Sequence, residues 1–209
     1  MPQPPTLKIS EIFFSAAGEG LRQGEPTIFV RLSGCNLRCP FCDTKYAWAG
    51  GEELGVDLIL SKIVGIGQKH PTDWVCLTGG EPLLQEVGPL VRLLKRNGYR
   101  IHLETNGTRS LSFKPDWLTV SPKPPDYQAT QSCRRQADEV KLVVTRGLKL
   151  EEVKKIRRAF SEKIPLLLQP QSNAGWSYKK AWKLYRQAVQ DGLKNIRLTC
   201  QLHKIYGIK

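Results

Sequence analysis

The sequence predicts an α/β fold in which mainly parallel strands form an incomplete, TIM-like (β/α) barrel. Short apolar or β-branched runs alternate with amphipathic helical stretches, and polar or glycine-containing turns follow the strand ends. A repeated strand, helix, strand order implies right-handed crossovers and a mainly parallel sheet. The candidate helices are too few for a complete barrel, so we expect the barrel to stay open.

The strands are expected where apolar and β-branched residues cluster between turn signals. In chain order they cover residues 7–14, 27–33, 74–78, 99–105, 117–121, 139–144, 164–170 and 195–199. Helical spacing of apolar residues predicts helices at 56–67, 83–98, 149–160 and 177–190. Asn97 and Gly98 form a C-terminal stop signal for the second helix. The proline-rich stretch 121–132 is interpreted as a connection, so we expect a single domain over residues 1–209.

Length and composition agree with a chain that folds alone. With 209 residues, 40% of them hydrophobic, the chain can bury a substantial core. Residues 1–10 contain no apolar signal-peptide segment, and no uncharged stretch reaches the roughly 18 residues of a membrane span. We therefore expect a cytoplasmic protein with no membrane partner. In that compartment a cysteine cluster favours metal binding or catalysis over disulfide bonds.

The net charge of +13 is unevenly distributed. Residues 1–132 hold 14 basic and 13 acidic side chains, whereas residues 133–209 hold 18 basic and 6 acidic ones. Much of the excess lies on the predicted helices 149–160 and 177–190, where it fits solvated outer faces. This distribution argues against a nucleic-acid partner, while an acidic partner, a polyanion or an anionic substrate stays an alternative.

Motifs rich in glycine and polar residues follow five of the predicted strands. They are SGCNLRC after 27–33, TGGEP after 74–78, TNG after 99–105, SPK after 117–121 and QPQS after 164–170. In parallel α/β folds the carboxyl ends of the strands gather the ligand-binding loops. The sequence therefore predicts one site built from several loops.

Cys35, Cys39 and Cys42 form a C-x3-C-x2-C motif that can surround a metal centre. A structural zinc site would need a fourth ligand, and the candidates are Cys76, Cys133, Cys200, His70, His102 and His203. None of these lies in a second paired motif, so closure would need one distant residue. A [4Fe-4S] cluster held by three thiolates would instead keep one iron open for a small molecule. Spacing alone leaves both alternatives open.

The cysteine motif, with Phe41 before its last cysteine, resembles the signature of the radical S-adenosylmethionine (SAM) enzymes, and GGEP at 79–82 is similar to their second motif. AGEGLRQGEPTIFVRLSGCNLRCPFCDT, LTGGEPLLQ, ETNGT, SPKPP and RLTCQLHK together resemble the 7-carboxy-7-deazaguanine synthase family, in the same order and over nearly the whole chain. Each motif is weak alone, but the set is specific.

The resemblance implies a radical SAM lyase with a radical SAM core fold and a short C-terminal segment that caps the substrate. It implies conversion of 6-carboxy-5,6,7,8-tetrahydropterin to 7-carboxy-7-deazaguanine, with release of ammonia, in the biosynthesis of queuosine and other 7-deazapurines. The implied cofactors are a [4Fe-4S] cluster, SAM and Mg²⁺. The implied partners are the pterin substrate, an electron donor such as flavodoxin or ferredoxin, and a second copy in a homodimer.

The resemblance also assigns roles to residues of this chain. The three motif cysteines would hold the cluster, and the Thr44 hydroxyl would bind Mg²⁺, a cation that prefers oxygen ligands. The positions that match SAM-contacting segments are Gly80, Glu81, Ser121, Pro122, Lys123, Gln169, Pro170, Gln171 and Ser172. The positions that match substrate contacts are Ala16, Ala17, Gly18, Arg31, Thr78 and Lys209. AAGEG stands here in place of the commoner LQGEG, so any contribution of a Gln side chain at position 17 is lost.

Structural interpretations compete with some of these roles. Glu81 could pair with a backbone N–H, Arg31 could form an ion pair, and His203 could simply pack the C-terminal segment. Cys76, Cys133 and Cys200 are interpreted as structural thiols. Two other functions also stay in view: an activase that makes a glycyl radical on a partner protein, and a basic zinc-binding RNA module.

Overall fold

The computed structural model describes residues 5–209 as two compact units. The first unit comprises residues 5–16, 25–105 and 111–117. The second comprises Ala17–Gly24, Asn106–Ser110 and Leu118–Lys209. None of the helices within residues 5–209 is long and apolar enough to cross a membrane. The single domain expected over 1–209, of which residues 1–4 lie outside the described part, stays a prediction.

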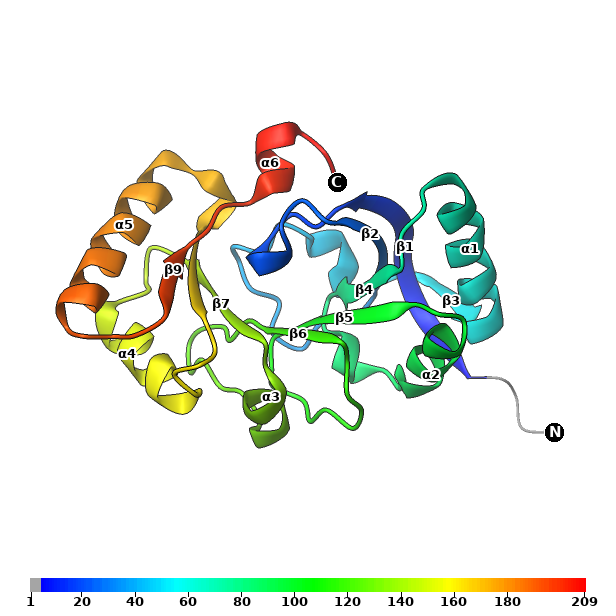
Figure 1. Cartoon of the computed structure of the whole chain (residues 1–209), viewed down its shortest axis with the longest axis horizontal. Helices are drawn as coiled ribbons and strands as arrows, with labels where there is room; N and C mark the ends of the chain where they lie inside the picture. Colours follow the sequence, from blue (N-terminus) through cyan, green and yellow to red (C-terminus); the bar gives the residue numbers. More distant parts are fainter. Residues whose placement is uncertain (1–4) are drawn as a thin grey trace. The chain divides into compact units, whose positions relative to one another are not determined.

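The first unit is built on a five-stranded sheet. Its strands are β1 (Thr6–Ala16), β2 (Pro26–Leu32), β3 (Glu52–Gly55), β4 (Trp74–Gly79) and β5 (Arg100–Thr105), in the spatial order β3-β1-β2-β4-β5. The strands β2, β4 and β5 run parallel, and β1 pairs antiparallel with β2 and β3. The helices are α1 (Val56–Lys69) and α2 (Gly88–Arg96), with short 3₁₀ turns η2 (Lys45–Trp48) and η3 (Pro82–Leu84). The α1 and α2 helices lie side by side (Figure 1).

The parallel strands of this sheet have one apolar and one polar face. Ile28 and Val30 of β2 are fully buried in register with Val75 and Leu77 of β4. The α1 helix covers this face, where a Cβ at Gly67 would lie 3.9 Å from Ile28 Cδ1. Because side chains alternate along a strand, the intervening residues lie on the opposite face. These residues are Phe29, Arg31, Cys76, Thr78, His102 and Glu104.

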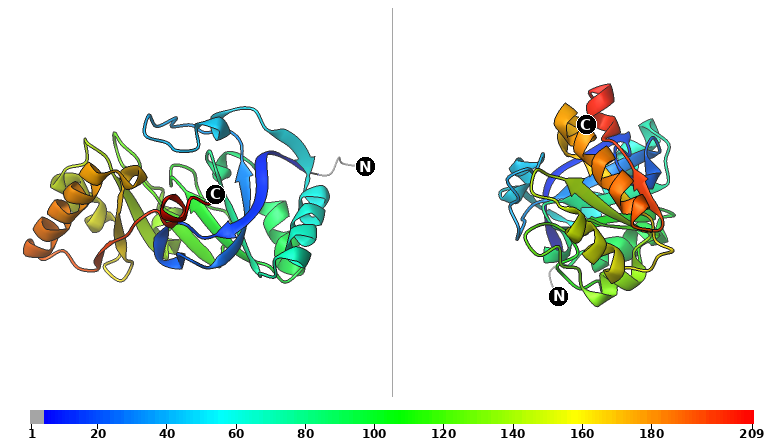
Figure 2. Two further views of the ribbon diagram at one scale, coloured as in Figure 1. Left: turned by 90° about the horizontal axis from the view of Figure 1, so that it is seen from above. Right: turned by 90° about the vertical axis from the view of Figure 1, so that its left-hand side faces the viewer.

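The second unit holds four parallel strands. They are β6 (Trp117–Val120), β7 (Glu139–Val144), β8 (Leu166–Pro170) and β9 (Ile196–Leu198), in the order β6-β7-β8-β9. The helical segments are η1 (Gly20–Arg22), α3 (Gln131–Gln136), α4 (Leu150–Ala159), η4 (Gln171–Asn173), α5 (Gly175–Gln190) and α6 (Leu202–Tyr206). The α4 and α5 helices pack together (Figure 2). The buried face of α5 carries Ser177, Ala181, Leu184 and Ala188 at helical spacing.

The mainly parallel α/β class is confirmed, and the predicted strands and helices are found close to their expected bounds. One predicted helix was wrong in part: residues 83–98 contain the end of η3, a break at Gln85–Val87, and then α2. The break arises because Pro89 has no N–H to bond within a preceding turn but suits the first turn of a helix. The strand β3 and the short helices α3 and α6 were not predicted. The incomplete barrel stays a prediction.

Candidate functional site

The three motif cysteines lie in a loop of the first unit between β2 and η2. Cys39 is buried, whereas Cys35 and Cys42 are partly exposed. The loop turns back on itself, because Cys42 N donates to Cys39 O at 3.0 Å and Gly34 N donates to Ala47 O at 2.9 Å. No disulfide joins any cysteines within residues 5–209. The thiols are therefore placed on one short loop, where they can serve as ligands of a common metal centre.

The spacing of these sulfurs distinguishes a cluster from a single zinc ion. Within residues 5–209, Cys35, Cys39 and Cys42 are not among the groups whose ligand atoms all lie within 4.8 Å of one another. Three thiolates at about 2.3 Å from one zinc ion would lie within about 4.6 Å of each other. As the loop stands, its three sulfurs are not all close enough together to share one zinc ion, and three thiolate donors on one loop suit an iron-sulfur group.

Backbone hydrogen bonds join the cysteine loop to the GGEP motif. Gly80 N donates to Leu32 O at 3.0 Å, and Glu81 N donates to Gly34 O at 2.7 Å. A Cβ at Gly80 would lie 2.9 Å from Ala47 O and closer still to the Gly34 carbonyl. Only glycine therefore permits this approach of backbone to backbone. The two motifs form one rigid element at the ends of β2 and β4.

The side chain of Glu81 has a structural role in this element. Glu81 is fully buried, and its Oε1 accepts hydrogen bonds from Leu83 N at 3.0 Å and from Thr105 Oγ1 at 2.7 Å. It thereby caps η3 and ties it to β5. The structural interpretation of Glu81 fits these contacts, and its contact with the SAM ammonium stays a prediction.

Arg31, Thr78 and Glu104 form a row across the polar face of the first sheet. Arg31 is in register with Thr78, and Thr78 Oγ1 donates to Glu104 Oε2 at 3.1 Å. On its other side Arg31 Nε donates to Glu11 Oε1 at 2.8 Å. Among residues 5–209 this is the one hydrogen bond of the Arg31 guanidinium. Its two terminal nitrogens can therefore bind a planar carboxylate in a bidentate manner.

Electrostatics keeps Arg31 charged. Burial disfavours the cation, but the hydrogen bond to Glu11 and the attraction of nearby acidic groups, including Glu104, outweigh burial and raise the pKa of Arg31. Tyr46 OH donates to the same Glu11 oxygen at 2.6 Å. Burial and this hydrogen bond raise the pKa of Tyr46 to about 12. The expected ion pair of Arg31 is thus present and does not occupy its whole fork.

The SAM-matching segments of the second unit lie at the carboxyl ends of β6 and β8, the strands on either side of β7. Ser121 Oγ donates to Lys141 O at 2.8 Å, and Lys123 Nζ donates to Ser121 O at 2.7 Å. On β8, Gln169 is 1% exposed, and its buried Oε1 has no hydrogen-bond partner among residues 5–209. A buried unpaired acceptor in a predicted ligand segment fits a site that a polar ligand completes. Ser172 and Asn173 have left-handed backbone angles that turn the chain sharply after Pro170.

The substrate-matching loop of the second unit contacts the C-terminal segment. Leu202 N donates to Gly18 O at 2.7 Å, and Ala17 is 3% exposed. A Cβ at Gly18 would lie 2.9 Å from Cγ of His203, so the missing side chain allows this packing. His203 therefore packs against the predicted substrate loop. Ala16 ends β1 in the first unit, and Lys209 is exposed beyond α6.

Glu19 lies in the same loop and has an unusually low pKa. Burial acts to raise it, but the Lys141 ammonium, together with hydrogen bonds from Lys141, Gln169 and Gln201, lowers the pKa of Glu19 to about 2. Gln201 Nε2 donates to Glu19 Oε1 at 2.6 Å, and Lys141 Nζ forms an ion pair with Oε2. Glu19 is therefore a carboxylate at every physiological pH.

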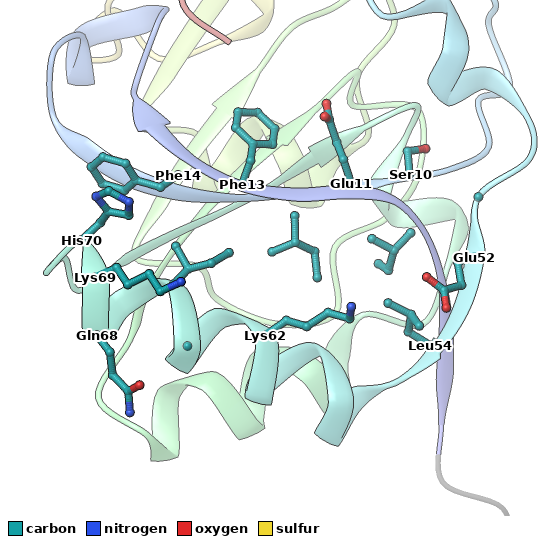
Figure 3. A pocket seen from close by; sticks show the side chains of 15 residues that line it. Ser10, Glu11, Phe13, Phe14, Glu52, Leu54, Lys62, Gln68, Lys69 and His70 are labelled. Atoms are coloured by element: carbon teal, nitrogen blue, oxygen red, sulfur yellow. The ribbon is translucent and has the colours of Figure 1, made fainter.

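A separate groove of about 930 Å³ lies in the first unit between β1 and α1. Figure 3 shows Lys62, Gln68 and Lys69 along the helix, and Phe14 stacked on His70 with ring centroids 4.4 Å apart. The residues that line the groove include none of the predicted site residues. Because Glu11 lines this groove and also binds Arg31, the groove borders the candidate site without containing its predicted residues.

Sequence reasoning missed the polar side chains that support the motifs. They are Glu11, Tyr46, Glu104, Lys141, Asn173 and Gln201. Glu104 had a usable signal, because it directly precedes TNG at the end of a predicted strand. Lys141 had a similar one, as a cation inside the run EVKLVV. The partners of the other residues depend on tertiary structure.

Comparisons with known proteins show which family this chain resembles. The Radical SAM superfamily model matches residues 29–168. The 7-carboxy-7-deazaguanine synthase of Methanospirillum hungatei is 34% identical over 215 residues, covering 99% of this chain and 88% of the relative. The synthase of the same name from Escherichia coli is 32% identical, covering 96% of this chain and 98% of the relative. The crystal structure of QueE from Escherichia coli has a TM-score of 0.79 at 28% identity and covers 95% of each chain.

Proposed function

The chain belongs to the 7-carboxy-7-deazaguanine synthase family of the radical SAM superfamily, and on that premise we propose that it converts 6-carboxy-5,6,7,8-tetrahydropterin to 7-carboxy-7-deazaguanine with release of ammonia. The observation that carries the proposal is the cysteine loop joined to GGEP beside a row of polar strand residues. Such a product would serve 7-deazapurine biosynthesis, including that of queuosine.

Cys35, Cys39 and Cys42 would hold the [4Fe-4S] cluster that membership of the radical SAM superfamily implies. Gly80 and the two segments Ser121–Lys123 and Gln169–Ser172 would contact SAM, with backbone approach at Gly80 and the buried Gln169 amide as supporting features. When bound, the cluster and SAM supply the carbon radical that takes hydrogen from the substrate. The chain itself binds, orients and shields the reactants.

The substrate carboxylate would bind to the terminal nitrogens of Arg31, which Glu11 holds in a fixed orientation. Thr78 would contact the pterin beside it, and Thr44 would supply an oxygen ligand to Mg²⁺. The Thr44 hydroxyl lies 3.5 Å from Cys42 Sγ, so such a cation would be close to the cluster loop. Ala16, Ala17, Gly18 and Lys209 would complete the substrate contacts.

Family membership also supports three further proposals: an electron donor such as flavodoxin or ferredoxin, a homodimer, and a cytoplasmic location. The shared name of the relatives favours the synthase over the glycyl-radical activase and over the zinc-binding RNA module. The open spacing of the cysteine sulfurs disfavours the zinc module further.

Anaerobic reconstitution tests the proposal. The purified chain is loaded with iron and sulfide, supplied with a reductant, SAM, Mg²⁺ and carboxytetrahydropterin, and the product is identified by mass spectrometry. We expect deazaguanine formation without any partner protein substrate. Cys35→Ala should abolish both SAM cleavage and product, whereas Cys133→Ala, in the second unit, should retain the cluster. Unaltered SAM cleavage in Cys35→Ala would overturn the cluster assignment.

A further inference from the structure

Glu19 lies at the centre of a buried network within the second unit. Its two carboxylate oxygens accept bonds from Lys141 of β7 and from Gln201, which precedes α6. The network is largely shielded from water, because the Lys141 side chain is 6% exposed, Gln201 is 5% exposed and the Glu19 side chain is 18% exposed. Hydrogen bonds between buried groups are strong. If one of these side chains moved away, its partner would stay buried without a hydrogen bond, which costs free energy.

The network reaches both SAM-matching segments. Gln169, the first residue of one segment, lies close enough to the Glu19 carboxylate to help lower its pKa. Ser121, the first residue of the other, donates to the backbone carbonyl of Lys141 at 2.8 Å. One segment therefore lies beside the Glu19 carboxylate, and the other contacts the backbone of Lys141, whose side chain holds Glu19.

The network also reaches the substrate-matching loop and the C-terminal segment. Gln201 exchanges two backbone-to-side-chain hydrogen bonds with Asn173, which follows Ser172: Asn173 Nδ2 donates to Gln201 O at 2.7 Å, and Gln201 N donates to Asn173 Oδ1 at 2.9 Å. The next residue, Leu202, donates to Gly18 O. Gln201 thus connects the SAM-matching and substrate-matching parts of this unit through adjacent bonds.

We propose that Gln201 is a positioning residue which, through Glu19, makes the binding of SAM and of the pterin substrate cooperative. The inference rests on the proposed function. If SAM orders Gln169–Ser172, the Gln201 amide then fixes Glu19 and the adjacent Ala17–Gly18 backbone in place. The pterin therefore loses less free energy to ordering this loop when it binds. Linkage requires the pterin to tighten SAM by the same factor.

The test measures, without turnover, the coupling factor, which is the factor by which each ligand lowers the Kd of the other. The reconstituted chain, kept oxidised with no reductant, is titrated with SAM by calorimetry, with and without saturating carboxytetrahydropterin. In the parent chain we expect the pterin to lower the Kd of SAM about fivefold or more. Gln201→Met keeps the length of the side chain and the backbone bonds to Asn173 but removes the donor to Glu19. It should reduce the coupling factor at least threefold, to near unity.

Gln187→Met is the matched control, because Gln187 lies on α5 of the same unit and makes no side-chain hydrogen bond to the residues in 5–209. Its coupling factor should equal that of the parent. Hydrogen exchange gives a second readout: SAM alone should protect the amides of residues 17–24 in the parent and not in Gln201→Met. A parent coupling factor below about twofold, or a Gln201→Met factor reduced less than threefold, overturns the inference. Product formation by the parent chain in the reconstitution assay would leave the proposed function standing in either case.

Discussion

The cysteine loop of the first unit and the Glu19 network of the second are both held tightly, but by different means. Backbone groups and close-packed glycines join the cysteine loop to GGEP. Charged and amide side chains from distant positions hold Glu19. The first arrangement depends mainly on backbone contacts that absent side chains permit, whereas the second depends on a charge. Substitutions and pH changes should therefore affect the stability of the two regions differently.

Gly80→Ala should have the largest effect on stability. The added Cβ would overlap the Gly34 carbonyl, which is backbone and cannot rotate away. We expect the free energy of unfolding to fall by about 3 kcal/mol, the upper range for overpacking, and cluster incorporation to fall with it. Iron and sulfide content per chain and the thermal midpoint measure both effects.

Gly65→Ala is the control for that change. Gly65 lies inside α1, and no atom lies within 4 Å of where its Cβ would be. This substitution should stabilise the chain by about 0.5–1 kcal/mol, because alanine favours the helix. Equal stability of the Gly80→Ala and Gly65→Ala chains would mean that the backbone contact at Gly80 is not tight.

Glu19→Gln should reveal the charge dependence of the second region. Because folding lowers the Glu19 pKa from 4.5 to about 2, its stabilising effect is complete above pH 4.5 and is lost as the pH falls toward 2. The substitution should cost on the order of 2 kcal/mol at pH 7, and the difference from the parent should shrink between pH 4.5 and 2. Urea unfolding followed by tryptophan fluorescence at several pH values measures the difference.

Glu162→Gln supplies the comparison with an exposed ion pair. Glu162 lies 3.6 Å from Lys194, and their side chains are 66% and 75% exposed. Solvent screens such a pair, so its loss should cost at most about 0.5 kcal/mol. A Glu19→Gln cost as small as this one, or one that does not change below pH 4.5, would show that the Glu19 network contributes little to folding.

The same contrast explains what the sequence could and could not predict. The cysteine loop and GGEP were found because each is a contiguous motif at the end of a strand. The Glu19 network joins residues 122 and 182 positions apart, and no local pattern records such a pairing. The strand β3 was missed because Glu52, Glu53 and Gly55 have low strand propensity and pair with β1 only through tertiary contact.

Thr44→Ala should have the smallest structural effect and tests an exception within the cysteine loop, where one side chain has a predicted ligand role. Its hydroxyl lies 3.5 Å from Cys42 Sγ and caps no helix, so its loss should leave the fold and the cluster intact. If the hydroxyl binds Mg²⁺, turnover should fall about tenfold, equivalent to about 1.4 kcal/mol, and the Mg²⁺ concentration for half-maximal rate should rise. The Kd of SAM should stay within about twofold of the parent value, because SAM would bind the cluster and Gly80.

Thr6→Ala, at the exposed start of β1, is the control and should change neither the Mg²⁺ dependence of turnover nor the Kd of SAM. An unchanged Mg²⁺ dependence in Thr44→Ala would mean that the cation, if it is needed, binds elsewhere, and the cysteine loop would then be held and used through its backbone and thiols alone.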